Sequence, residues 1–160
     1  MNNKYNPYPP VNIKNRQWPN NTITKSPTWC SVDLRDGNQA LVEPMDSIRK
    51  MRMFKQLLGM GFKEIEIGFP SASETDFNFV RELILDNHIP LDVTVQVLTQ
   101  ARKPLIEKTI QSLEGCNRAI IHLYNSTSTL QREVVFRETM EGVKEIATNG
   151  AKIIAEKLSK

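Results

Sequence analysis

Strands and helices alternate along most of this chain, and the alternation restricts the fold more than any other sequence feature. Each run typical of a strand is followed by a segment whose apolar residues recur at helical spacing. The strand-like runs begin near residues 28, 63, 93 and 118. A parallel sheet with right-handed crossover helices is the arrangement that such a repeat favours. We therefore predict four βα units.

The predicted elements are separated by turn and capping signals. Strands are expected over residues 28–34, 63–69, 92–100 and 117–125, and helices over 46–61, 73–87, 103–115 and from 128 towards Lys160. Proline residues exclude a helix before residue 28, so we predict a proline-rich arm over 1–27 and an α/β domain over 28–160. The aromatic residues of the arm indicate that it packs on its own domain or on a partner subunit.

Capping residues and apolar spacing support the first two helices. Asp46 or Ser47 can cap the first helix, and Ser73 can cap the second with Asp76 in the position of a capping box. The expected apolar face of the first helix is Ile48, Met51, Phe54 or Lys55, and Leu58, and that of the second is Phe77, Val80, and Leu83 or Ile84.

A parallel sheet leaves two architectures, a doubly wound open sheet and part of a (βα)8 barrel. The glycine-rich phosphate fingerprint of many doubly wound folds is missing after the first strand. Polar residues instead share one face of the later strands, namely Glu64 with Glu66, Thr94 with Gln96, and His122 with Tyr124. Polar residues on one face suit the interior of a barrel near its catalytic mouth. We predict the N-terminal half of a TIM barrel, truncated after four of its βα units.

Candidate site residues follow from that architecture, because barrel chemistry occurs where strands end. The apolar run from residue 29 to residue 34 ends in Arg35 and Asp36, and Gln39 follows closely. Asp36 could ligate a hard cation, and Arg35 could bind an oxyanion. A structural ion pair between Arg35 and Asp36 is the alternative reading. His122 reads either as a core residue or, with Tyr124 near the mouth, as a substrate contact.

Glu66 is predicted to be a buried carboxylate that pairs with Arg35 or another cation of the barrel. The net charge of +3 is weak and its charges are interspersed, which argues against nucleic acid as a partner. No signal core and no apolar run of membrane-spanning length occurs in the sequence, so we expect a cytoplasmic protein. Cys30 and Cys116 match no metal or redox spacing and are expected to be reduced, buried thiols.

Several motifs resemble the 2-isopropylmalate synthase family in its long-chain form. They are "WCSVDLRDGNQALVEPMD", "KEIEIGFPSASETDFNFVR", "VQVLTQAR" and "AIIHLYNSTSTLQREVVF", together with the arm around "YNPYPPV" and "RQWPNN". The resemblance covers essentially the whole chain. It implies a metal-dependent barrel enzyme that transfers the acetyl group of acetyl-CoA to 2-oxoisovalerate in leucine biosynthesis. A homodimer is expected on a separate ground, because a half-barrel leaves apolar strand edges and helix faces uncovered. Homocitrate and citramalate synthases and hydroxymethylglutaryl-CoA lyase belong to the same wider group.

The resemblance also implies roles for individual residues. Asp36 matches a carboxylate ligand of a divalent cation, magnesium or manganese, and Arg35 matches the catalytic arginine that stabilises an oxyanion. His122 and Tyr124 match positions that line the oxo-acid pocket, whereas Glu66 and Gln39 match positions beside the metal and substrate.

The family's His-x-His metal pair, its acid/base residues and its regulatory domain are expected downstream of residue 160. The histidines of this chain, His88 and His122, cannot form that pair, so we expect the 160-residue chain alone to be inactive. Two other functions stay open: another reaction of the same group, or a non-catalytic half-barrel that pairs with another chain.

Overall fold

The computed structural model describes residue 9, residue 14 and residues 25–158. The predicted arm over 1–27 therefore lies almost entirely outside the described residues. The described elements, in chain order, are β1 (Cys30–Ser31), η1 (Asp33–Gly37), α1 (Ser47–Gly59), β2 (Glu64–Gly68), α2 (Glu74–Leu85), β3 (Thr94–Gln100), α3 (Lys103–Ser112), β4 (Ala119–Tyr124), η2 (Gln131–Phe136) and α4 (Met140–Leu158).

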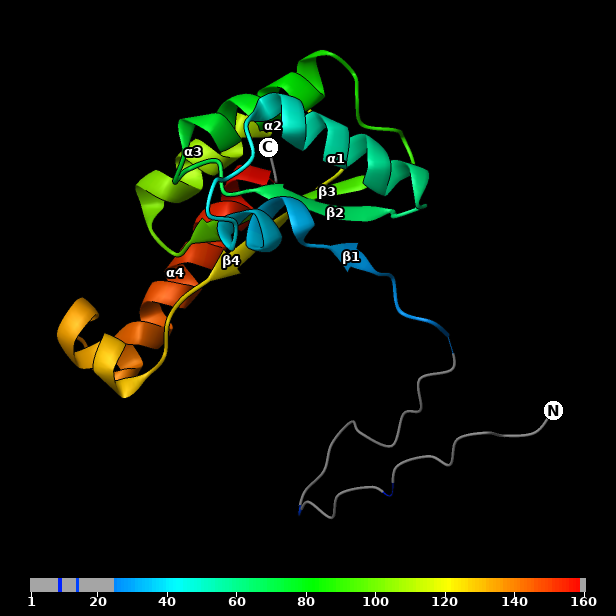
Figure 1. Cartoon of the computed structure of the whole chain (residues 1–160). Coiled ribbons are helices and arrows are strands. Elements are labelled where there is room, and N and C mark those ends of the chain that lie inside the picture. The colour runs from blue at the N-terminus through cyan, green and yellow to red at the C-terminus, as the bar shows by residue number, and fades with distance from the viewer. Residues whose placement is uncertain (1–8, 10–13, 15–24, 159–160) are drawn as a thin grey trace.

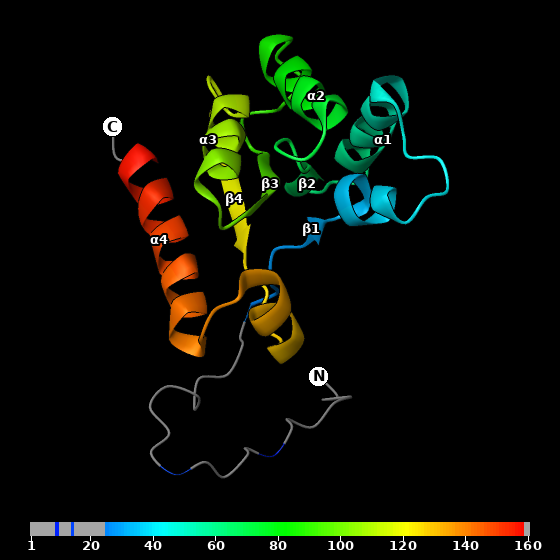
Figure 2. The same ribbon diagram turned by 90° about the vertical axis from the view of Figure 1, so that its left-hand side faces the viewer.

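The sheet within residues 25–158 has four parallel strands in the order β1-β2-β3-β4. Helices α1, α2 and α3 lie on one side of this sheet (Figure 1). Seen from a direction turned by 90°, α1 to α4 form an arc around the strands (Figure 2). Sequential parallel strands with helices on one side are the arrangement of a barrel segment, whereas a doubly wound sheet carries helices on both faces. The predicted half of a TIM barrel is confirmed.

The core lies between the helices and the sheet. Alternate side chains of β2 and β3 point to the helices, because successive strand residues face opposite sides. Ile65 and Ile67 of β2 and Val95 and Val97 of β3 are fully buried in this way. The core also includes Leu34, Phe54, Leu57, Phe79, Val80, Leu83 and Val93. The residues between them on β2 and β3 are thereby directed to the opposite, inner face.

Helix α1 begins as predicted and buries most of the expected face, with Phe54 in the core and Met51 and Leu58 packed against it. Asp46 caps it, accepting a hydrogen bond from the Arg49 amide at 2.8 Å. Phe54 and Leu57 are buried, while Ile48 is 82% exposed, so the prediction for Ile48 is wrong. The buried face also includes Lys50, a charged residue that hydrophobic periodicity assigns to the surface.

Helix α2 has the predicted cap but not the predicted capping box. Ser73 accepts from the Asp76 amide at 3.3 Å. The Asp76 carboxylate, however, accepts from the Phe69 amide at 2.7 Å instead of closing a box on Ser73. Phe79, Val80 and Leu83 are the buried residues of α2, and the expected Phe77 is only partly buried.

The last predicted helix is interrupted. Helix η2 ends before Arg137, whose φ of 55° is left-handed, and α4 starts three residues later. A non-glycine residue in that conformation cannot continue a right-handed helix. Pro104 near the start of α3 and Gly115 after its end agree with the prediction. No helix among the described residues is both long and apolar enough to cross a membrane.

The observed face of α1 predicts unequal costs for two truncations. Phe54→Ala should lower the free energy of unfolding by about 3–5 kcal/mol, because it leaves a cavity in a closed core. Ile48→Ala is the matched control and should change it by less than about 0.5 kcal/mol, because that side chain is in solvent. Urea unfolding of the chain measures both, and equal costs would contradict the observed orientation of α1.

Candidate active site

The arginine and aspartate of the "LRDG" stretch lie in a short helix rather than at the end of a strand. Strand β1 stops at Ser31, and Asp33–Gly37 form a π-helix. The Val32 carbonyl receives the amides of Arg35 at 3.2 Å, Asp36 at 2.9 Å and Gly37 at 3.1 Å. The predicted strand over 28–34 is therefore too long, because these bonds close a helical turn immediately after β1. Single-turn π-helices are rare in proteins, and those that occur are often at functional sites.

Two contacts fix this turn on the domain. Leu34 is fully buried in the core between η1 and the sheet. The Ser31 hydroxyl donates to the Asp33 carboxylate at 2.6 Å, which ties the start of the turn to β1. Because Leu34 is buried in the core, the neighbouring Arg35 is directed to the opposite, inner face of the sheet.

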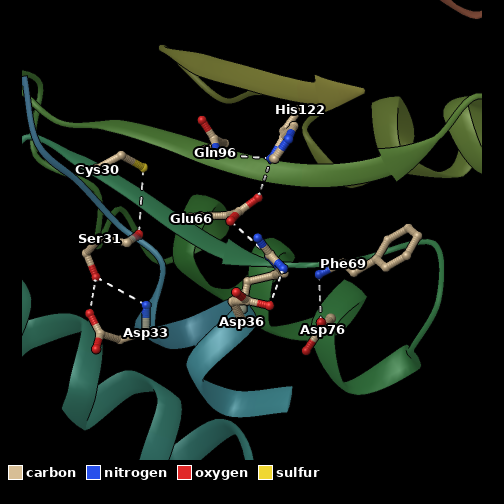
Figure 3. Close-up of polar contacts among 10 residues, drawn as sticks. Cys30, Ser31, Asp33, Asp36, Glu66, Phe69, Asp76, Gln96 and His122 are labelled. Carbon is tan, nitrogen blue, oxygen red and sulfur yellow. Dashed lines mark hydrogen bonds and ion pairs between the residues drawn. The ribbon is translucent and has the colours of Figure 1, made fainter. Parts of the chain in front are cut away.

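Glu66 is the centre of the polar contacts on this inner face. Its carboxylate is fully buried, and it accepts from Arg35 Nε at 2.9 Å with one oxygen. Its other oxygen lies 2.9 Å from His122 Nδ1. Figure 3 shows Glu66 on β2 between η1 and His122 on β4. One carboxylate thus joins Arg35 of η1, 31 positions before it in the sequence, to His122 of β4, 56 positions after it. The predicted pairing of Glu66 with Arg35 is present.

The Glu66 contact also fixes the His122 ring. A carboxylate only accepts, so His122 Nδ1 must carry the hydrogen, and Nε2 is left for other partners. The Gln96 amide nitrogen lies 3.4 Å from the same Nδ1. It cannot donate to a nitrogen that already bears a hydrogen. Glu66, rather than Gln96, therefore determines which nitrogen of His122 is protonated.

An open pocket of about 370 Å³ lies above this group. It is lined by Arg35, Gln39, Phe69, Leu98, His122 and Tyr124. Four of the sequence-predicted residues thus meet at one pocket, with Glu66 bound to two of them. Arg35 and the imidazole give it a polar end, while Phe69 and Leu98 supply apolar surface. Such a pocket suits a small anion with an aliphatic group.

Phe69 and Leu98 were missed by the sequence reasoning, although a signal existed for each. Leu98 lies between Gln96 and Gln100 at a spacing of two, which places it on their inner face. Phe69 follows directly after β2, at the end of the strand where barrel sites form. Its aromatic side chain reads from the sequence as one more core residue.

Asp36 lies beside the pocket rather than among its lining residues. Its carboxylate is 66% exposed and pairs with Arg35 Nη1 at 2.7 Å. The described residues contain no group of three His, Cys, Asp or Glu side chains that could hold a metal ion. An exposed carboxylate is a suitable ligand for a hard cation, so these residues fit one corner of a metal site and not a whole one.

The cysteines are free but only partly buried, so the prediction of buried thiols is wrong in degree. Burial, followed by the negative charges of Glu66 and Glu64, raises the pKa of the Cys30 thiol. Burial also raises the pKa of Cys116. Both side chains are thereby held as neutral thiols, and neither has the lowered pKa of a cysteine nucleophile.

The sequence profile of the HMGL-like family matches residues 26–159. The match spans most of the chain and all ten described elements, so the chain belongs to the HMGL-like family of barrel proteins.

Within that family the chain is similar to 2-isopropylmalate synthases. It is 60% identical to the 2-isopropylmalate synthase of Rhodospirillum rubrum over 98% of this chain and 28% of that protein. It is 63% identical to that of a Parafrankia species over 96% of this chain and 27% of that protein, and 59% identical to that of Agrobacterium fabrum over 98% and 28%. The chain thus spans little more than a quarter of the length of these relatives.

Leu34 anchors η1, which carries Arg35, in the core, so its truncation should lower the stability of the domain. Leu34→Ala should lower the free energy of unfolding by about 2–5 kcal/mol, because the side chain is fully buried. Leu91→Ala, at an 80% exposed position, is the control and should have little effect. Chemical denaturation measures both. A cost below about 1 kcal/mol for Leu34→Ala would show that η1 is not anchored through this residue.

Proposed function

We propose that this chain is part of a 2-isopropylmalate synthase, an acyltransferase that condenses acetyl-CoA with 2-oxoisovalerate in leucine biosynthesis. The observation that carries the proposal is the pocket formed by Arg35, His122 and Tyr124 in a chain about 60% identical to such synthases. The pocket has a cationic end for a carboxylate or carbonyl oxygen and an apolar end for a short branched chain.

Arg35 is the proposed catalytic residue and also binds the oxo acid. Its guanidinium has five N–H donors, of which Glu66 uses one at Nε and Asp36 one at Nη1. Further donors are therefore available to an oxygen of the substrate. Glu66 restricts the orientation of the guanidinium, so the donors are in place before the substrate arrives. Preorganised donors aimed at developing charge are the most effective electrostatic catalysts.

The reaction places negative charge on the carbonyl oxygen of the oxo acid, which Arg35 is proposed to bind. A base removes a proton from the methyl carbon of acetyl-CoA, and the resulting carbanion attacks the carbonyl carbon of the oxo acid. A C–C bond forms, the electron pair of the C=O bond moves to oxygen, and this oxygen then takes up a proton. Arg35 stabilises this oxyanion, and His122, through Nε2, and Tyr124 orient the oxo acid. Hydrolysis of the thioester then releases CoA.

A divalent cation, magnesium or manganese, belongs to the proposal, with Asp36 as one ligand. When bound, such a cation polarises a carbonyl oxygen and stabilises charge on it. Glu66 is a positioning residue for this site, because both of its oxygens already contact Arg35 and His122. Gln39 is proposed to contact the substrate from the pocket wall.

The remaining ligands and the acid/base residues are proposed to lie in the part of the synthase that the relatives have and this chain does not cover. The 160 residues alone are therefore expected to be inactive. The proposal also includes a cytoplasmic location and a homodimer.

Two substitutions in the full-length enzyme test the role of Arg35. Arg35→Lys keeps the charge but loses the planar fork, so kcat should fall about 10²–10³-fold while the oxo acid still binds. Arg52→Lys, at an exposed position of α1, is the matched control and should leave kcat unchanged. The measurement is steady-state kinetics with the oxo acid varied. Normal kcat in Arg35→Lys with weaker acetyl-CoA binding alone would make Arg35 a binding residue only.

A single carboxylate predicts weak metal binding by the 160-residue chain. Magnesium or manganese should bind more weakly than about 1 mM, because Asp36 alone leaves the ion largely hydrated. Asp36→Asn should remove even this binding, whereas Asp92→Asn on the surface should not affect it. Titration calorimetry measures all three. One stoichiometric micromolar site in the unmodified chain would contradict the proposal that further ligands lie elsewhere.

A further inference from the structure

Phe69, like Gln39, borders two neighbouring pockets. It lines the 370 Å³ pocket beside Arg35 and also a second pocket of about 430 Å³. The second pocket lies between the loop that follows η1 and the starts of α1 and α2, with Met45, Asp46 and Ser73 among its walls. The Phe69 ring packs edge-on against the ring of Tyr124, with centroids 6.3 Å apart and an interplanar angle of 76°.

An ion pair between buried Lys50 and partly buried Asp76, a residue of the second pocket's wall, holds the backbone of Phe69. The Phe69 amide donates to Asp76 Oδ2 at 2.7 Å (Figure 3). The other oxygen of Asp76 pairs with the ammonium of Lys50, whose side chain is fully buried. The same ammonium lies 5.4 Å from the centroid of the Phe79 ring. A chain of contacts thus runs from Lys50 of α1 through Asp76 of α2 to Phe69, which lines both pockets.

Neighbouring backbone is fitted to this arrangement. Gly68 has a φ of +157°, and a Cβ atom added there would lie 2.8 Å from Asp76 Oδ2. The pairing of β2 with β3 shifts register between Glu66 and Gly68, immediately before Phe69. β-Bulges next to active sites commonly re-aim a side chain.

Stability alone does not account for the Lys50–Asp76 pair. Removing lysine from water is unfavourable, and apolar residues of similar volume are often at least as stabilising in such places. What an apolar pair could not supply is an acceptor for the Phe69 amide. Positioning of Phe69 is therefore the role that the geometry of the pair serves.

We propose that Lys50 and Asp76 are positioning residues for Phe69, and that the Phe69 ring limits the length of the aliphatic group on the 2-oxo acid. The second statement rests on the proposed function. With the carboxylate and carbonyl of the substrate directed to Arg35, its aliphatic group extends along Leu98 towards Phe69. A ring fixed at two points, by its amide and by Tyr124, restricts the space available to that group.

The first experiment measures substrate selectivity. It uses the full-length enzyme and 2-oxo acids whose unbranched aliphatic groups differ by one methylene. Phe69→Ala should raise kcat/KM for the longer relative to the shorter acid by about tenfold or more, because one methylene in an apolar pocket is worth that much. Phe77→Ala, a partly buried phenylalanine of α2 outside both pockets, is the control and should leave the ratio unchanged. An unchanged ratio in Phe69→Ala would overturn the role of its ring.

A double substitution tests the positioning residues without leaving a buried charge unpaired. Lys50→Met with Asp76→Ala should shift the ratio in the same direction as Phe69→Ala, while circular dichroism shows an intact fold. Asp92→Asn, which breaks the exposed pair with Lys63, is the control. A wild-type ratio in the folded double variant would overturn the positioning role. If it does not fold, Gly68→Ala, which displaces Asp76, replaces it and is judged by the same ratio.

The positioning claim also has a test that needs no turnover. In the 160-residue chain, NMR should show contacts between the rings of Phe69 and Tyr124 and a Phe69 amide protected from hydrogen exchange. The folded double variant should lose both signals, and the Asp92→Asn chain should keep them. Signals retained in the double variant would contradict the claim. If the unmodified enzyme condensed no 2-oxo acid, the proposed function would fail. The NMR experiment would still decide whether Lys50 and Asp76 position Phe69.

Discussion

The buried carboxylate of Glu66 is the interaction on which the site depends. It lies on the inner face of β2 and contacts Arg35 of η1 and His122 of β4 with separate oxygens. A buried carboxylate needs such partners, because an unpaired one would carry a large desolvation penalty. The contacts with Arg35 and His122 therefore stabilise the charge of Glu66, and they also give these two side chains a fixed orientation towards one pocket.

The polar inner face depends on the apolar packing of the outer face of the sheet. Ile65 and Ile67 alternate with Glu66 along β2 and are buried in the core that residues of α1 and α2 also form. A packed core on the helix side leaves the other side of the strands for polar chemistry, as in the interior of a barrel near its mouth. The π-helical turn of η1 then brings Arg35 to Glu66 while Asp36 faces solvent beside the pocket.

The periodicity of the sequence was sufficient to predict four βα units and their parallel order, because alternation in strands and apolar spacing in helices are local signals. It also placed Glu66 and His122 on one inner face. It could not predict the π-helix of η1, in which the amides of Arg35, Asp36 and Gly37 all bond to the Val32 carbonyl. Nor could it predict buried Lys50, because only the tertiary position of Asp76 makes that burial tolerable.

The pairing of Glu66 with Arg35 is tested most directly by a double-mutant cycle in the 160-residue chain. Glu66→Gln, Arg35→Gln and the double variant would be unfolded in urea, with a second cycle on the exposed Lys63–Asp92 pair as reference. The account predicts a coupling of about 1–3 kcal/mol for Glu66 with Arg35, larger than that of the reference pair. Additivity of the two single changes within about 0.5 kcal/mol would contradict it, because the carboxylate would then not be holding the arginine.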